Sequence, residues 1–316
     1  MLQYLIILLD DTSVSFCHYE NKKTERRLIP LNDLKEGILF AMKQNLMVQF
    51  VYPAYELPES YQTVIESIDN HKIQPASFGN TDADVVVYTC REAISETGFI
   101  HKDGAAFVLR VNKEELFAGY TEILLLLKRL NRLTLVVTDI ETFRKEDVER
   151  YGEIVSTFKK GIMEQFDGES IPQLNLLTDR VRLDKMNNCN AGVGNITLAP
   201  NGKFYICPAF YLEDEAEAAG NPVDGLDIPN KQLYKLNYAP LCRNCDAFHC
   251  KRCVWLNRKT TLEVNTPSHE QCVTAHLERN MSRMLLKELQ AKGLFPGKEI
   301  KAIDYTDPFE VKERFQ

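Results

Sequence analysis

Short apolar runs alternate with amphipathic segments along the first half of the chain. The run Leu2–Leu9 is continuously apolar, which is typical of a buried parallel strand. Leu31–Asn45 carries apolar residues at helical spacing, with Asn32 or Asp33 as its cap. Further strands are predicted at Val48–Tyr52, Asp84–Tyr88, Ala105–Val111, Leu133–Thr138 and Pro172–Leu177, and further helices at Pro58–Asn70, from about Arg91, at Phe117–Leu130 and at Lys145–Phe166. This alternation predicts an α/β fold with parallel strands and right-handed crossovers.

The number of predicted strand–helix units limits the architecture. Six units are too few to close an eight-stranded barrel, so a partial barrel and a doubly wound sheet stay open. No G-x-G-x-x-G follows a predicted strand, and the sequence contains no G-x-x-x-x-G-K-[ST]. Both absences argue against dinucleotide and P-loop sites.

Composition narrows the class of protein further. The 316 residues are 44% hydrophobic and carry a formal net charge of −7. An intrinsically disordered chain is excluded by this apolar content, and the acidic balance argues against binding to nucleic acid. The longest apolar runs are far shorter than the ~20 residues that cross a bilayer. The first residues carry no basic segment and reach Asp10 after a short apolar run. We therefore expect a cytoplasmic protein with no membrane partner.

The cysteines are distributed unevenly. Seven of the nine lie between Cys189 and Cys272. Without a secretory signal, such clustering favours metal ligation over disulfides. The predicted metal ligands are Cys189, Cys207, Cys242, Cys245, Cys250, Cys253 and Cys272.

The spacing of these cysteines contains two recognisable patterns. Asn201-Gly202 predicts a hairpin turn between strands at Ile196–Leu198 and Phe204–Ile206, which brings Cys189 and Cys207 toward one end. Cys242 to Cys253 reads C-x2-C-x4-C-x2-C, in which each C-x2-C pair offers two thiolates from one tight turn. Both iron–sulfur and zinc centres suit such ligands.

The complete cysteine pattern resembles the SPASM domain of radical SAM peptide-modifying enzymes. The family's central block is usually one residue longer in each of its last two gaps. The resemblance implies one or two [4Fe–4S] clusters. The first would be held by Cys189, Cys207 and Cys253, and the second by Cys242, Cys245, Cys250 and Cys272. The family's further cysteine just before the first ligand is missing here, and Asp184 and His249 are candidate replacements by proximity in sequence.

The first part of the chain resembles radical SAM proteins with a degenerate cofactor site. That family has a partial (βα)6 barrel with C-x3-C-x2-C after its first strand, and here the matching positions are Ser13, Cys17 and Glu20. One thiolate cannot hold the SAM-binding cluster, so we expect no radical SAM activity from this chain alone, with Cys17 as a buried thiol.

These resemblances predict three parts: a degenerate radical SAM-like partial barrel in 1–183, a SPASM-like Cys-rich metal-binding domain in 184–275, and a C-terminal helix and tail in 276–316. A helix is expected from Ser268 to about Gly293. His249 is a zinc ligand, a donor close to a cluster, or an exposed imidazole.

The whole chain also resembles the CXXX repeat peptide maturase family. The stretches that carry this resemblance are LIILLDDTSVSFCHY near the start and CRNCDAFHCKRCVWLNRKTT from Cys242. Members of this family are encoded beside a radical SAM/SPASM enzyme and a small ribosomal peptide with repeated Cys-x-x-x units. The resemblance implies a role in maturing that peptide.

Three functions stay open. The preferred one is an accessory maturation protein with iron–sulfur clusters, a radical SAM/SPASM partner enzyme and a Cys-rich precursor peptide. Iron–sulfur is preferred because the first-site spacing follows the SPASM pattern. The second is a zinc-stabilised module that binds a peptide or partner without a redox role. The third is an enzyme whose open cluster site binds a substrate thiolate, although no acid–base constellation is visible.

Overall fold

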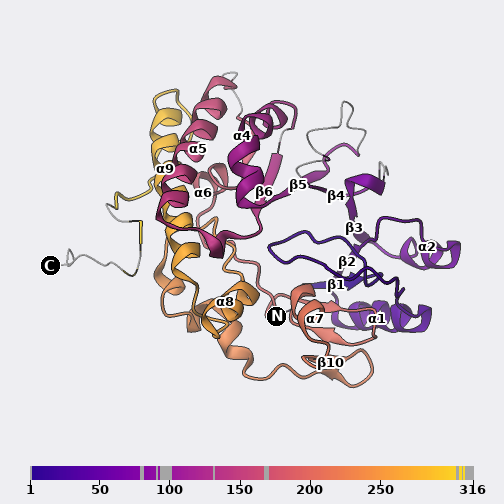
Figure 1. Cartoon of the computed structure of the whole chain (residues 1–316). Coiled ribbons are helices and arrows are strands. Elements are labelled where there is room, and N and C mark those ends of the chain that lie inside the picture. Colours follow the sequence, from indigo (N-terminus) through magenta and orange to yellow (C-terminus); the bar gives the residue numbers. More distant parts are fainter. Residues whose placement is uncertain are drawn as a thin grey trace. The chain divides into compact units, whose positions relative to one another are not determined.

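The structure is a computed structural model, and it describes residues 2–78, 82–89, 92, 102–130, 132–166, 171–303, 306–307 and 309 (Figure 1). The chain forms two compact units. Unit 1 comprises Met1–Tyr88, Glu96–Ala106 and Cys189–Ala239, and unit 2 comprises Thr89–Ser95, Phe107–Asn188 and Pro240–Gln316. Each unit therefore combines segments from distant parts of the sequence.

Unit 1 is built around a mostly parallel sheet. Its strands are β1 (Tyr4–Leu8), β2 (Met47–Val51), β3 (Asn70–Pro75), β4 (Val85–Thr89), β8 (Asn195–Leu198) and β9 (Phe204–Tyr205), and its helices are α1 (Leu31–Gln44), α2 (Glu59–Ile65) and α7 (Pro208–Glu213). The strand order is β4-β3-β2-β1-β8-β9, and β9 alone runs antiparallel to its neighbour. A separate ribbon pairs β10 (Gly220–Asn221) with β11 (Gly225–Leu226).

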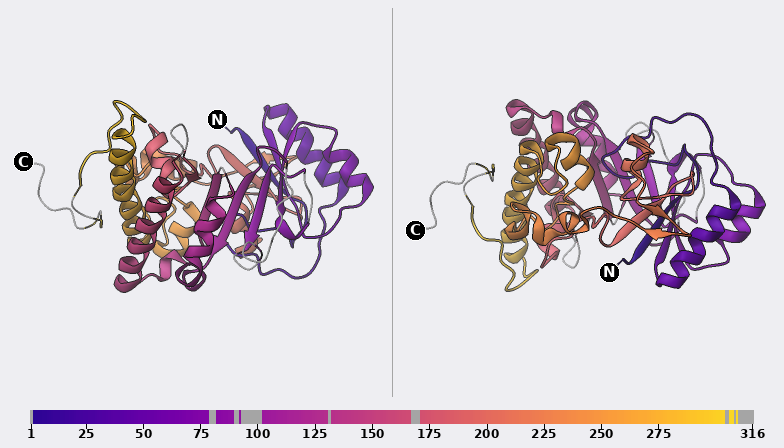
Figure 2. Two further views of the ribbon diagram at one scale, coloured as in Figure 1. Left: turned by 90° about the horizontal axis from the view of Figure 1, so that it is seen from above. Right: turned by 90° about the horizontal axis from the view of Figure 1, so that it is seen from below.

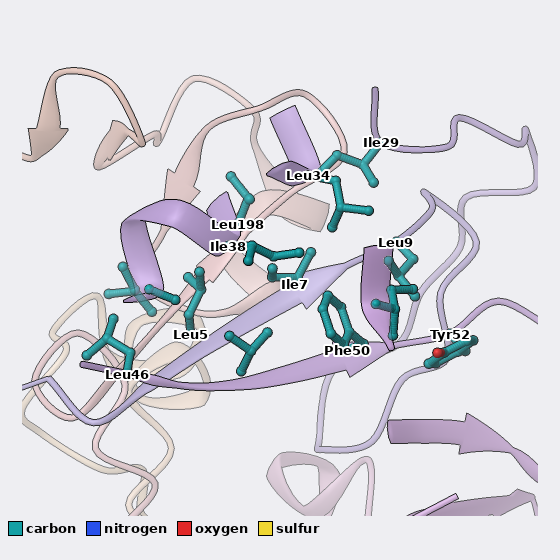
Figure 3. Packing of buried hydrophobic residues seen from close by; sticks show 14 of the residues in the cluster. Leu5, Ile7, Leu9, Ile29, Leu34, Ile38, Leu46, Phe50, Tyr52 and Leu198 are labelled. Atoms are coloured by element: carbon teal, nitrogen blue, oxygen red, sulfur yellow. The ribbon is translucent and has the colours of Figure 1, made fainter. Parts of the chain in front are cut away.

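The core of unit 1 lies between this sheet and α1. Alternate residues of β1 and β2, among them Leu5, Ile7 and Phe50, are fully buried and meet Leu34 and Ile38 of α1 (Figure 3). Side chains alternate between the two faces of a strand, so these residues all point to the same side of the sheet. Burial of this apolar face is what holds α1 against the strands.

The remaining strands, β5 (Ala106–Val111), β6 (Arg132–Val137) and β7 (Gln173–Leu174), come with the segments of unit 2 and pair in parallel in that order. The helices of unit 2 are α4 (Lys113–Leu127), α5 (Lys145–Glu164), α6 (Thr178–Arg182), α8 (Val254–Thr261) and α9 (His269–Gln290). Figures 1 and 2 show α5 and α9 lying side by side. The short helix η5 (Cys242–Asn244) opens the cysteine-rich segment.

The predicted α/β fold with mostly parallel strands is confirmed. In unit 1 the strands β1 to β4 follow one another across the sheet in chain order, which is compatible with a partial barrel. The predicted hairpin is also present, because β8 and β9 pair antiparallel around a turn with Gly202 at φ 74°. The hairpin joins the main sheet through the parallel pairing of β8 with β1. The three-part division at 183 and 275 stays a prediction.

Two predicted elements are wrong in extent. The helix expected over Pro58–Asn70 ends at Ile65, and Asn70–Pro75 forms the unpredicted strand β3. The strand expected at Pro172–Leu177 pairs over only two residues before α6 begins at Thr178. The helix expected from about Arg91 lies almost wholly outside the described residues.

Candidate metal centre

Two tight turns shape the segment that carries Cys242, Cys245 and Cys250. The 3-10 turn η5 starts at Cys242, and the Cys245 amide donates to the Cys242 carbonyl at 3.1 Å. A second turn closes when the Cys250 amide donates to the Ala247 carbonyl at 2.9 Å. The predicted C-x2-C-x4-C segment therefore folds back on itself instead of extending as a loop.

The last cysteine of the pattern lies in the first turn of α9. Ser268 caps this helix, and its Oγ accepts a hydrogen bond from the Gln271 amide at 3.2 Å. Cys272 and His276 are four residues apart on α9, so they lie on the same face of the helix, one turn from each other.

Four thiols and one imidazole line a common cavity. Its lining residues are Cys242, Cys245, Cys250, Cys272 and His276, together with Met186, Ala247, Arg252, Pro267, Gln271 and Ala275. All of them belong to unit 2. The Nε2 of His276 lies 3.4 Å from the Sγ of Cys245. The structure thus brings together the four cysteines that the SPASM resemblance assigns to the second cluster.

The thiols of this cavity are hard to ionise in the absence of a cation. Burial raises the pKa of Cys242 to about 11 and that of Cys250 to about 12. Burial is likewise the largest cause of the raised pKa of Cys272, followed by repulsion from Cys250, Cys242 and Cys245. A bound cation would remove both penalties, because it favours the thiolate form of every ligand.

His276 is uncharged at neutral pH. Burial lowers the pKa of its imidazole to about 4. A neutral imidazole has one nitrogen with a lone pair, which can bind a metal, and one N–H, which can donate a hydrogen bond to a thiolate.

The donor set of this cavity fits a thiolate-bound metal, whereas its geometry is not that of a closed single-ion site. Tetrahedral zinc would hold its sulfurs about 3.8 Å apart. In the described part of the chain, no three Cys, His, Asp or Glu side chains converge around one ion position. The free volume of the cavity is about 20 Å³, which is room for about one water molecule. Thiols with few other donors nevertheless suit iron–sulfur clusters and zinc better than harder cations.

The three cysteines predicted for the first cluster are divided between the units. Cys189 and Cys207 belong to unit 1, and Cys253 belongs to unit 2. Cys189 is exposed, and Cys207 precedes α7 at its cap position. The Sγ of Cys253 accepts a hydrogen bond from the Leu256 amide at the start of α8, at 3.5 Å. A first cluster at these residues stays a prediction.

The two candidate replacement ligands have other partners. Asp184 is exposed and pairs with the Nζ of Lys298 at 2.5 Å. His249 is buried, and its Nε2 lies 3.0 Å from the Oε2 of Glu278, which rules out the exposed-imidazole interpretation. The remaining cysteine of the described residues, Cys17, is half-buried.

None of the eight described cysteines forms a disulfide.

Sequence reasoning missed His276 and the charged residues around the cysteine turns. The C-x3-H spacing from Cys272 to His276 was the available signal, since a predicted helix places both on one face. The contact of His249 with Glu278 on α9 could not be found this way, because sequence spacing does not reveal contacts between distant segments.

Neither a known protein-family model nor a curated protein sequence matches this chain. Among the described residues, no helix has the length and apolar character needed to cross a membrane.

Proposed function

We propose that this chain is an accessory maturation protein whose unit 2 carries a metal centre at Cys242, Cys245, Cys250 and Cys272, with an iron–sulfur cluster as the metal group. The observation that carries the proposal is that these four half-buried cysteines line one cavity. An iron–sulfur cluster would supply electron transfer there. In such a cluster each cysteine thiolate binds a different iron, so the four thiolates need not converge on one point as ligands of a single ion do.

The proposed partners follow from the resemblance to peptide maturases. They are a radical SAM/SPASM enzyme and a Cys-rich precursor peptide with repeated Cys-x-x-x units. The chain lacks two of the three cysteines of a SAM-binding site, since Ser13 and Glu20 stand at those positions. A division of labour, in which the partner enzyme generates the radical, accounts for this loss.

The function is tested by modification of a synthetic Cys-x-x-x repeat peptide. The peptide is incubated with the proposed radical SAM/SPASM partner enzyme, S-adenosylmethionine and a reductant, with or without this chain, and analysed by mass spectrometry. We expect the metal-loaded chain to increase modification, and the Cys250→Ser variant to fail. Equal modification with and without the chain would refute the accessory role.

A zinc-stabilised binding module is the second candidate. The small volume of the cavity and the nearby His276 favour it, because a single ion needs less space than an eight-atom cluster and binds imidazole well. Colourless protein with about one zinc ion per chain would select this alternative.

The third candidate, an enzyme that binds a substrate thiolate at an open cluster, is tested with the same peptide. A Ser-x-x-x version has no thiolate to offer. If the chain binds both versions equally in calorimetry, direct thiolate ligation is excluded.

A further inference from the structure

Asp246, the residue after Cys245, is held by two buried arginines. Its carboxylate accepts hydrogen bonds from Arg279 of α9, at 2.8 Å from Nε and 2.5 Å from Nη2. Arg180 of α6 adds a contact of 3.2 Å from its Nη2. Both arginine side chains are almost wholly inaccessible to solvent. This two-point pairing fixes both the position and the orientation of the carboxylate.

A second buried contact holds His249, the residue before Cys250. Its Nε2 lies 3.0 Å from Oε2 of Glu278 on α9, and the Tyr151 hydroxyl of α5 donates to the other oxygen of that carboxylate. His249, Glu278 and Tyr151 are all buried. The Tyr151 contact thereby ties α5 into the same connection.

The backbone between these two side chains is also anchored. The Asn187 amide donates to the Phe248 carbonyl at 2.8 Å, and the Arg180 guanidinium lies over the Phe248 ring, 4.4 Å from its centre. The segment from Asp246 to His249 is therefore held at three of its four residues, Asp246, Phe248 and His249. Cys245 and Cys250 flank it directly, so its position determines theirs.

The helix that holds this segment also supplies the other side of the cavity. Cys272 and His276 lie on α9, as do Glu278 and Arg279. Removing one member of a buried ion pair leaves its partner charged and desolvated, which makes such contacts strong constraints on conformation.

We propose that Asp246 and Glu278 are positioning residues that hold the segment between Cys245 and Cys250 against α9, so that the cysteine cavity is formed before any metal binds. The inference rests on the proposed function only in what occupies the cavity. The preformed state of the thiols is a property of the metal-free protein.

Cysteine alkylation in the metal-free protein tests the proposal. N-ethylmaleimide is added in excess, and the modification of each cysteine is followed by mass spectrometry. In Asp246→Asn we expect Cys245 and Cys250 to react about tenfold faster or more, because the lost ionic hydrogen bonds make local opening easier. Asp246→Glu restores the carboxylate and should return the rates to within about threefold of wild type, as expected from retained pairing.

Two controls separate local opening from general destabilisation. Glu288→Gln removes the pair with Lys159, which also joins α9 to α5 but does not involve the cysteine segment. This variant should leave the rates at Cys245 and Cys250 unchanged. Cys207 of unit 1 serves as an internal reference and should react at the wild-type rate in every variant.

Three results would overturn the proposal. They are wild-type rates at Cys245 and Cys250 in Asp246→Asn, equal acceleration at Cys207, or equal acceleration in Glu288→Gln. The test remains informative if the purified protein contains no metal, since that result refutes the metal centre and leaves the alkylation rates to decide the positioning role. Retained helical circular dichroism shows that Asp246→Asn is folded. Glu278→Gln provides a second variant, in which we expect Cys250 to be alkylated faster.

Discussion

His276 adds an imidazole to the cysteines that line the cavity. Its Nε2 lies 3.4 Å from the Sγ of Cys245, and burial holds its pKa at about 4, so it is neutral wherever the thiolates are. A neutral imidazole beside a thiolate donates a hydrogen bond to the sulfur or binds the metal itself. Either role would strengthen a metal centre at these cysteines without adding charge.

We predict that His276→Ala weakens metal retention. Loss of a contact to a metal ligand typically costs about 10–100-fold in metal affinity. The measurement is the rate of metal transfer to a coloured chelator. His269→Ala is the matched control, since His269 lies on the same helix with an exposed side chain that pairs with Asp307. Equal release from His276→Ala and wild type would show that the imidazole contributes nothing to the centre.

Helix α9 is the element on which the site depends most, because it carries Cys272 and His276 and binds the segment between Cys245 and Cys250. Its start is fixed by Ser268. We predict that Ser268→Ala lowers the free energy of unfolding by about 1 kcal/mol, since an unsatisfied amide is left at the helix start. Urea unfolding measures this change. Ser268→Asp keeps an acceptor and should cost less; a loss as large as that of alanine would contradict the capping role.

The sheet core of unit 1 gives a second prediction at this scale. Phe50 is fully buried in β2, between the sheet and α1. We expect Phe50→Ala to lower the free energy of unfolding by about 3–5 kcal/mol, because it removes apolar contacts and leaves a cavity. Thermal unfolding tests this. Leu39→Ala on α1 is the control, since Leu39 is 44% exposed and should change stability little.

The elements also show what the sequence could and could not reveal. Strands such as β1 and β2 were predicted because their apolar residues are continuous or alternate clearly. Strand β3 was missed because Asn70–Pro75 contains one large aliphatic residue, Ile73, and ends in a proline. Its strand conformation comes from pairing with β2 and β4, a tertiary contact that local pattern does not encode.

At the scale of the whole molecule, distant segments combine in ways that composition alone cannot predict. The β8–β9 hairpin was predicted from Asn201-Gly202, yet the pairing of β8 with β1 joins residues almost two hundred positions apart. The SPASM resemblance implied that Cys242, Cys245, Cys250 and Cys272 share one site, and in unit 2 these four cysteines line one cavity. It did not indicate the ionic contacts that hold them, because those depend on the packing of α6 and α9.

Metal binding should stabilise the folded protein as a whole. A ligand that binds only the native state adds about 2.7 kcal/mol when present at a hundred times its dissociation constant. For a chain of 316 residues we expect chelation to lower the Tm by about 4 °C. Differential scanning calorimetry with and without chelator measures the shift. The Tm of Cys250→Ser should be the same with and without chelator. If the chelator leaves the Tm of the wild-type protein unchanged, that result would argue against a metal centre.

The most direct test of the central claim is the iron, zinc and acid-labile sulfide content of the anaerobically purified protein, with its visible absorption spectrum. We predict about four irons and four sulfides per chain with a broad visible band, which is one [4Fe–4S] cluster. Cys250→Ser should lose most of both. Colourless protein without iron or sulfide would contradict an iron–sulfur centre, and the additional absence of zinc would contradict any metal centre at these cysteines.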